Sequence, residues 1–457
     1  MNTDQLAQLA RTYNVAGPRY TSYPTALHLQ EVEHPSDANE LLALRYESPG
    51  AYSLYIHIPF CFSLCWYCGC TKVITKDQDR GDHYLDYLEK EIALTSNYLH
   101  RNHSVHQIHL GGGTPTFLSP PQLRRLFSIL HTHLNIAPGA ECSAEIDPRT
   151  CTADHVLALA DVGCNRASLG VQDTNPEVQE AIHRIQPFEQ TVRVTEQLRK
   201  AGIDEINFDL IYGLPLQTPD TFSKTLADAI SLKPGRFAVY SYAHLPGVMP
   251  AQRLLNEADM PTGSKKLDLL LMAVDTLPKH GYRFIGMDHF ALDDDPLTVA
   301  MENGTMHRNF MGYTTQSGLE TIALGMSGIS QHDRYMLQNH KDLQQYYDHL
   351  DSGSLPVAKQ LTLSDDDRVR RDIIMQIMCS QTVSFDAIST PDGSSFRSYF
   401  NDELMALTPL QEDGLVELSG DGLSATETGR YFLRNIAMAF DASLHSKRAA
   451  ASYSATV

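Results

Sequence analysis

The stretch IPFCFSLCWYCGC (residues 58–70) places four of the chain's eight cysteines within ten positions. Cys61, Cys65 and Cys68 follow the spacing C-x3-C-x2-C, and Cys70 comes two residues later. Three thiolates on so short a loop can bind three corners of one iron–sulfur cubane and leave the fourth iron open to a cosubstrate. A structural zinc site is the alternative. Zinc usually takes paired ligands from two separated loops, however, and the sequence has no second CxxC pair.

The cysteine loop opens a region, from about Tyr52 to Ala243, in which strand-like and helix-like stretches alternate. The expected strands are 53–58, 105–110, 141–147, 166–172, 206–213 and 237–243. The expected helices are 82–99, 120–134, 152–163, 188–202 and 218–232. This order predicts an α/β fold with a parallel sheet and helices outside it, curved into a partial (β/α)6 TIM-like barrel.

Polar or small residues follow each predicted strand, at the edge where such barrels carry their chemistry. After the cysteine loop these are Gly111–Thr114, Glu145, Asp147, Gln172, Asp209, Tyr242 and Ala243. The glycines of GGGTPT (111–116) let a ligand approach the backbone closely. Glu145 and Asp209 each have two interpretations, as hydrogen-bond acceptors for a ribose or as salt-bridged strand-end residues.

Two further segments flank this region. The segment GPRYTSYPTA (17–26) is too aromatic for a disordered tail. We therefore expect residues 1–50 to form an irregular but ordered arm, and we expect this arm to cover the active site. The catalytic domain is expected over residues 51–350 and a smaller, mainly helical domain over 356–457. In that domain, helices at 364–379 and 398–412 precede a hairpin within 414–429 and a helix from Arg430, which suits either a winged-helix module or a plain helical cap.

Composition narrows the functional classes. The 457-residue chain has a formal net charge of −19, which disfavours nucleic acid as a partner. No apolar run is long enough to span a membrane, and the polar N-terminus lacks the pattern of a secretory signal. We therefore expect a cytoplasmic protein, and a monomer.

The cysteine spacing after the first strand is the signature of the radical S-adenosylmethionine (SAM) superfamily. Within it, the chain closely resembles the oxygen-independent coproporphyrinogen III oxidases. The motifs that carry this resemblance are GPRYTSYPTA, YIHIPFC, CGC, GGGTPT, GVQ, DLIYGLPLQT, GMDHFA and HRNFMGYTT. The arm motif and Cys70 distinguish these oxidases from the related haem chaperones, which typically lack both features.

The resemblance implies one 4Fe–4S cluster on Cys61, Cys65 and Cys68, with Cys70 important for activity without being a ligand. It also implies two SAM molecules. The first would contact Tyr55, Tyr67, Gly112, Glu145 and Ile329, and the second Gly113, Thr114, Gln172, Arg184, Asp209 and Ala243. The implied reaction uses a 5′-deoxyadenosyl radical to convert two propionates of coproporphyrinogen III to vinyl groups. An electron donor would reduce the cluster, and an unidentified acceptor would take up electrons from the substrate.

A substrate with four carboxylates needs cationic partners. We predict that Arg19 and His307 or Arg308 bind the propionates, the alternative being that they are ordinary surface residues. A haem-binding chaperone and a radical SAM methyltransferase that opens haem are the competing functions.

Overall fold

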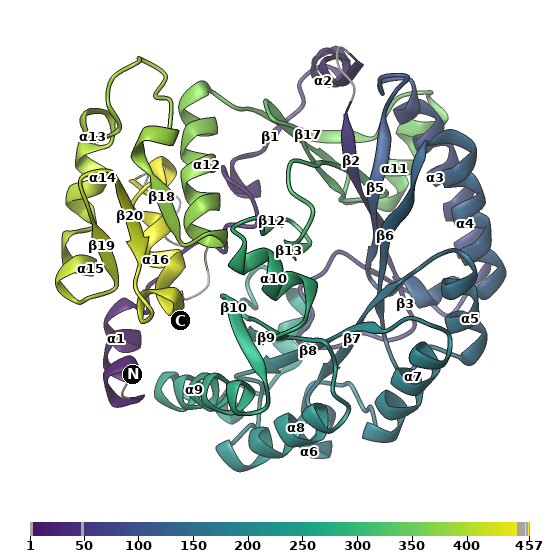
Figure 1. The fold of residues 1–457 in the computed structure, drawn as a ribbon. Coiled ribbons are helices and arrows are strands. Elements are labelled where there is room, and N and C mark those ends of the chain that lie inside the picture. Colours follow the sequence, from purple (N-terminus) through teal and green to yellow (C-terminus); the bar gives the residue numbers. More distant parts are fainter. Residues whose placement is uncertain (1–2, 47–49, 446–452, 454–455, 457) are drawn as a thin grey trace.

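A run of parallel strands forms the centre of the computed structural model, which describes residues 3–46, 50–445, 453 and 456. The six predicted strands are confirmed and are neighbours in chain order: β2 (Ala51–Ile58), β5 (Ser104–Gly112), β6 (Ile136–Ile146), β7 (Arg166–Gln172), β8 (Glu205–Tyr212) and β9 (Arg236–Ser241). The predicted helices are confirmed as α3 (Asp79–Ser96), α4 (Pro120–His133), α5 (Ala153–Asp161), α7 (Phe188–Lys200) and α8 (Pro219–Ser231), and α6 (Pro176–Ala181) is additional. The helices lie outside the curved sheet (Figure 1).

Alternation along the strands separates an apolar outer face from a polar inner face. On β8, Phe208 and Leu210 are fully buried in the main apolar cluster, which also contains side chains of α7 and α8. Burying a side chain of this size contributes roughly 1.5–3 kcal/mol. The intervening Asn207 and Asp209 face the barrel interior, where they hydrogen-bond to each other. The same alternation therefore packs the helices and fills the barrel with polar groups.

The sheet extends beyond the six predicted strands at both edges. On the β2 side, β14 (Glu320–Leu324) is parallel to β2, and β15 (Ile329–Gln331), β16 (Tyr335–Asn339), β17 (Val357–Thr362) and β1 (Gln30–Glu31) follow as antiparallel strands. On the other side lie β11 (His289–Leu292) and β10 (Tyr282–Gly286). The large sheet thus continues through Thr362, past the expected domain boundary at residue 356.

Several further elements complete the catalytic region. They are β3 (Phe60–Cys61), β4 (Val73–Ile74), α9 (Gly263–Lys279), α10 (Pro296–Glu302), β12 (His307–Asn309), β13 (Gly312–Thr314) and α11 (Leu343–Asp351). The hairpin β12–β13 is separate from the large sheet. In Figure 1 it lies over the centre of the fold, beside α10.

The arm is less irregular than the sequence suggested. It contains α1 (Thr3–Tyr13) and α2 (Pro35–Ala43), which the sequence interpretation missed. Helix α1 buries Leu6, Leu9 and Ala10 in an apolar cluster that it shares with α9 and with the C-terminal region, so its partners lie in distant parts of the chain. The tyrosine-rich motif is ordered as expected, with Tyr20 and Tyr23 at 1% and 2% exposure.

The C-terminal region begins with α12 (Asp365–Cys379), close to the predicted helix 364–379. The stretch predicted to be helical over 398–412 is helical but divided into α13 (Phe396–Tyr399), α14 (Asn401–Ala406) and α15 (Thr408–Glu412), with a proline in the first turn of α15. The predicted hairpin is β19 (Val416–Leu418) with β20 (Gly422–Ala425), and β18 (Thr382–Ser384) adds a third strand before α16 (Leu433–Met438). A three-stranded antiparallel sheet with helices favours the winged-helix alternative.

Gly429 provides a test of how the C-terminal region is packed. A Cβ atom at this position would lie 1.8 Å from the backbone oxygen of Leu415, which cannot move without disturbing the strand start. We expect Gly429→Ala to lower the free energy of unfolding by about 2–3 kcal/mol. Gly420→Ala is the matched control, because a Cβ atom there would have no other atom within 4 Å. Urea unfolding followed by circular dichroism measures both, and equal stabilities would contradict the packing.

Candidate active site

The cysteine loop is fixed at its start by the backbone of the glycine-rich segment. Gly113 N donates to Ile58 O at 2.8 Å and Thr114 N donates to Phe60 O at 2.9 Å. A Cβ on Gly113 would lie 2.6 Å from the carbonyl oxygens of Pro59 and Phe60, so only glycine permits this contact. On the other side, Val73 N donates to Pro59 O at 2.7 Å. The loop is therefore clamped between β5 and β4.

Positive charge surrounds the thiols. Arg149 Nη2 lies 3.4 Å and Arg184 Nη1 lies 3.6 Å from Cys65 Sγ, and both arginines also bind the carboxylate of Asp147. Lys72 Nζ donates to the backbone oxygens of Cys68 and Cys70. Burial alone would raise the pKa of Asp147, but Arg184 and Arg149 outweigh it and lower that pKa to about 2.

Cys70 lies beside Cys68. A hydrogen bond from Cys70 is the main reason that the pKa of Cys68 is lowered to about 6. The pKa of Cys61 is instead raised to about 12, chiefly by burial. Cys70 is exposed and lines the largest of the cavities described below, whereas Cys65 is buried. The extra cysteine thus contacts one of the predicted cluster ligands and faces open space.

The donor set suits an iron–sulfur cluster. The three thiols are soft ligands, none is in a disulfide, and the buried Arg184 and the partly buried Arg149 offset the negative charge that thiolates bring. Over the described ranges, no three His, Cys, Asp or Glu side chains converge on the position of a single metal ion. A cubane does not require such convergence, because each thiolate binds a different iron.

A cavity of about 490 Å³ lies next to the loop. Its walls include Tyr55, Gly112, Glu145 and Ile329, four of the five residues predicted for the first SAM molecule. Tyr67 is not among the lining residues; its ring packs against a small apolar cluster with Val178 and Leu214. Glu145 Oε2 accepts from Gly112 N at 3.3 Å, and His109 Nε2 lies 3.4 Å from Oε1. With its side chain 45% exposed, Glu145 remains open to a ligand.

Residues predicted for the second SAM molecule fall into separate groups. Gly113 and Thr114 hold the cysteine loop, whereas Gln172 and Arg184 lie together beside Gly170, whose backbone oxygen accepts from Arg184 Nη2 at 2.7 Å. The backbone oxygen of Ala243 accepts from Gln252 Nε2 at 3.2 Å.

Asp209 lies deeper, in a polar cavity of about 110 Å³. It accepts hydrogen bonds from Ser168 and Asn207. Burial raises its pKa to about 7, and no cation within the described residues forms an ion pair with it.

The residues predicted to bind substrate come from distant parts of the chain. Arg19 forms an ion pair with Asp288 and lies 5.7 Å from the centre of the Tyr240 ring. Arg308 lies 4.5 Å from the Tyr313 ring, and is buried with no partner for Nε or Nη1. His307 and Arg308 both line a cavity of about 290 Å³ that the arm and α12 also border. Arg308 is therefore a buried residue, whereas the side chain of Arg19 is 31% exposed and lies against Asp288 and Tyr240.

Comparison with known proteins agrees with this geometry. Residues 55–229 match the radical SAM superfamily, and residues 363–432 match the HemN C-terminal domain. A protein of Pseudomonas aeruginosa named oxygen-independent coproporphyrinogen III oxidase is 46% identical over 95% of both chains. The chain belongs to the oxygen-independent coproporphyrinogen III oxidase family. The Escherichia coli protein of the same name is 42% identical over 96% of this chain and 95% of its own. The solved structure of the Escherichia coli coproporphyrinogen III oxidase HemN, described as a radical SAM enzyme, has a TM-score of 0.89 and covers 93% of this chain and 97% of its own.

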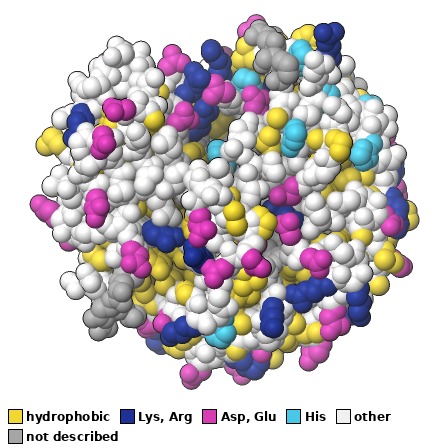
Figure 2. All heavy atoms as spheres, viewed as in Figure 1, with side chains coloured by type: hydrophobic (Ala, Val, Ile, Leu, Met, Phe, Trp, Pro, Cys, Tyr) yellow, Lys and Arg dark blue, Asp and Glu magenta, His cyan; other side chains and the backbone are white. Residues whose placement is uncertain are grey.

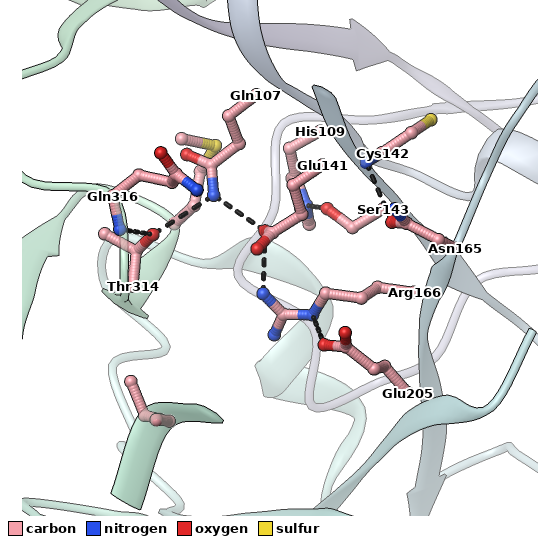
Figure 3. A network of polar contacts seen from close by, with 12 residues as sticks. Gln107, His109, Glu141, Cys142, Ser143, Asn165, Arg166, Glu205, Thr314 and Gln316 are labelled. Carbon is pink, nitrogen blue, oxygen red and sulfur yellow. Dashed lines mark hydrogen bonds and ion pairs between the residues drawn. The ribbon is translucent and has the colours of Figure 1, made fainter. Parts of the chain in front are cut away.

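Sequence reasoning missed the polar network inside this oxidase fold (Figure 3). Glu141 accepts from Gln107 Nε2 and from Arg166 Nη1, each at 2.7 Å, and Gln107 Nε2 also lies 3.2 Å from Thr314 Oγ1. Arg166 Nε lies 3.5 Å from Glu205. The network joins β5, β6, β7 and β8 to the hairpin that carries Arg308. The sequence feature that could have revealed this network is the polar residue at every second position along these strands, such as Gln107 and His109.

Arg149 and Arg434 were also missed. Arg434, on α16, donates to the backbone oxygens of Gly17 and Pro18 and so holds the arm directly before Arg19. Arg149 follows Asp147 by two residues, and this spacing was the available signal for their pairing. Among the described helices, none is long and apolar enough to cross a membrane.

Proposed function

We propose that this family member catalyses the oxidative decarboxylation of two propionate side chains of coproporphyrinogen III to vinyl groups, which gives protoporphyrinogen IX. The observation that carries the proposal is the clamped three-cysteine loop at the mouth of the barrel, in a chain that matches oxidases of this name over 95% of its length. The cofactors are a 4Fe–4S cluster on Cys61, Cys65 and Cys68 and SAM.

When bound, the reduced cluster and SAM supply a 5′-deoxyadenosyl radical that abstracts hydrogen from the propionate β-carbon. The chain's own residues bind and orient the cofactors and the substrate, and they shield them from water. Tyr55, Gly112, Glu145 and Ile329 line the large cavity and would contact SAM there, and the carboxylate of Glu145 would accept hydrogen bonds from the ribose hydroxyls. Ala26 and Leu27 of the arm also line this cavity and restrict its access to water.

A second SAM molecule would contact the other predicted set: Gly113, Thr114, Gln172, Arg184, Asp209 and Ala243. The proximity of Gln172 to Arg184 supports the proposal in part. Tyr67 and Cys70 complete the proposed site, with Tyr67 next to the adenine and Cys70 facing the cavity.

The carboxylates of the substrate are bound by Arg19 and Arg308, with His307 beside them. Arg308 supports this most directly, because two of its guanidinium nitrogens are buried without partners, and a buried, unpaired cation is costly. A propionate placed in the adjoining cavity supplies the missing acceptors. Figure 2 shows the face of the molecule that is also seen in Figure 1, with basic and acidic side chains interspersed over it and a hollow in its upper half.

We expect Arg308→Met to lower kcat/KM for coproporphyrinogen III at least tenfold while leaving the substrate-free cleavage of SAM unchanged, because only the porphyrinogen needs the guanidinium. Arg19→Ala should behave in the same way. Arg101→Met, at an exposed position, is the control. Anaerobic assays of vinyl product and of 5′-deoxyadenosine measure the two activities, and unchanged porphyrinogen kinetics in Arg308→Met would remove this residue from the site.

The function itself is tested by one anaerobic reaction. The reconstituted protein receives dithionite, SAM and coproporphyrinogen III, and vinyl product is followed together with 5′-deoxyadenosine. We expect both to form. A parallel reaction with haem tests the alternatives: haem bound without porphyrinogen turnover would indicate a chaperone, and a linear tetrapyrrole a methyltransferase.

We propose a cytoplasmic monomer that receives electrons from a donor at the cluster and passes substrate electrons to a separate acceptor. We also propose the division into an arm (1–50) that covers the active site, a catalytic domain (51–350) and a C-terminal domain (356–457), whose first residues add strand β17 to the catalytic sheet. Ala26 and Leu27 in the cavity wall support the role of the arm.

A further inference from the structure

Glu91 is a buried carboxylate outside the predicted site. It lies on α3 with 2% of its surface exposed. Its Oε2 accepts from Gly325 N at 2.7 Å and from Tyr346 Oη at 2.6 Å, and its Oε1 accepts from Asn339 Nδ2 at 2.6 Å. Burial raises its pKa to about 7, against the effect of these three donors. All three partners are neutral, and no cation in the described part of the chain forms an ion pair with it.

The three donors come from three separate elements. Gly325 begins the turn between β14 and β15, Asn339 ends β16, and Tyr346 lies on α11. Asn339 Nδ2 also donates to Gly325 O at 2.9 Å, and Asn339 N donates to Gly328 O at 2.9 Å. The turn 325–328 is therefore held at both of its ends by groups that Glu91 binds.

The turn is also pressed against the strand that leads into the cysteine loop. Gly325 has φ +91°, and a Cβ there would lie 2.4 Å from Tyr84 Oη and 2.7 Å from His57 O. Tyr84 Oη donates to His57 O at 2.8 Å and accepts from Met326 N at 3.1 Å. Helix α3 thus contacts the turn through both Tyr84 and Glu91.

The far side of the turn faces the large cavity. Ser327 and Ile329 line that cavity, together with Gln338 of β16. Ser327 has φ +61°, a left-handed conformation that costs energy in a non-glycine residue, and its N–H donates to His340 O at 2.8 Å. A strained turn holds its shape only where its surroundings fix it, and Glu91 binds groups that fix both ends of this one.

We propose that Glu91 is a positioning residue for SAM, because it anchors the turn 325–328 that forms one wall of the cofactor cavity. The inference rests on the proposed assignment of SAM to this cavity. Glu91 touches no reacting group and acts through Gly325 and Asn339. Outer groups of this kind, which orient a binding wall, typically change affinity by about 10–100-fold when they are replaced.

The chemistry of the site requires a carboxylate rather than an amide. Every partner donates a hydrogen bond, so a glutamine would direct its NH2 group at a donor in either orientation. Glu91→Gln keeps the volume of the side chain but leaves at least one buried donor unpaired and pushes the turn from its position.

The experiment compares reconstituted Glu91→Gln, wild-type and Glu89→Gln proteins. Glu89 is the matched control, because it lies two residues away on α3 with its side chain 45% exposed. SAM affinity is measured by equilibrium dialysis without porphyrinogen, and the electron paramagnetic resonance spectrum of the reduced cluster is recorded before and after SAM is added. We expect unchanged iron content in all three proteins and a Kd for SAM about tenfold higher in Glu91→Gln alone, with a spectral change that needs correspondingly more SAM.

An unchanged Kd in Glu91→Gln would overturn the proposal. So would loss of iron from a folded Glu91→Gln protein, because the residue would then act on the cysteine loop. If this variant does not fold, Tyr346→Phe removes a single donor and should raise the Kd about threefold; an unchanged Kd there contradicts the proposal equally. No porphyrinogen is present, so failure of the proposed substrate assignment would leave the SAM result intact.

Discussion

Cys65→Ala is expected to bind almost no iron–sulfur cluster and to form no vinyl product or 5′-deoxyadenosine above background. Cys65 is the most buried of the three predicted ligands and the one that both arginines contact. Its loss leaves two thiolates for the cluster and leaves Arg149 and Arg184 paired with Asp147 but without the thiolate that both contact. The expected fall in turnover is more than about a thousandfold, because the cofactor carries the chemistry.

Iron and sulfide content per chain, the absorbance of the anaerobic protein and the product assay measure this effect. Cys379→Ala is the control, because Cys379 is a buried thiol of the C-terminal region far from the loop in sequence. It should keep its cluster and most of its activity. Normal iron content in Cys65→Ala, or zinc without iron in the anaerobically prepared wild type, would contradict the assignment of the loop.

Arg184→Met is expected to lower the free energy of unfolding of the apoprotein by about 1.5–3 kcal/mol, because it removes one of the two cations that bind Asp147, whose side chain is 11% exposed. The same variant should weaken SAM binding in the holoenzyme. Arg283→Met removes an arginine that also pairs with two carboxylates, Asp293 and Glu302, but at the surface. This control should unfold almost like the wild type. Urea unfolding measures both variants, and equal stabilities would contradict the role of the buried pair.

The pH dependence of the same pair has a definite sign. The pKa of Asp147 is lowered from 3.8 to about 2 in the folded protein. Its stabilising contribution is therefore fully present above the unfolded pKa and is lost as the pH falls from about 4 towards 2. Between pH 5 and pH 3 the wild-type apoprotein should lose about 1 kcal/mol through this group. Arg184→Met should lose less over that interval, whereas Arg283→Met should match the wild type.

Local patterns were enough to predict the barrel. Each of its first five strands is followed by its own predicted helix, so period and turn signals could be recognised within about 20–40 residues. The edge strands β14, β15 and β16 follow one another without intervening helices, and β17 follows α11. These strands were missed, because short antiparallel strands carry a weak periodic signal. The arm was taken as irregular because the burial of α1 depends on distant partners, on α9 and near residue 430.

The candidate site also has features that the sequence predicts and features that it does not predict. The sequence by itself determined the three-thiolate loop and the polar strand ends, because spacing along one segment fixes what that segment can bind. Only the tertiary structure decided that Arg149 and Arg184 approach Cys65, that Arg434 holds the arm at Arg19, and that Glu91 reaches a turn more than 230 residues away. Contacts between distant segments depend on how buried charges find partners when the chain packs, and no local pattern encodes that choice.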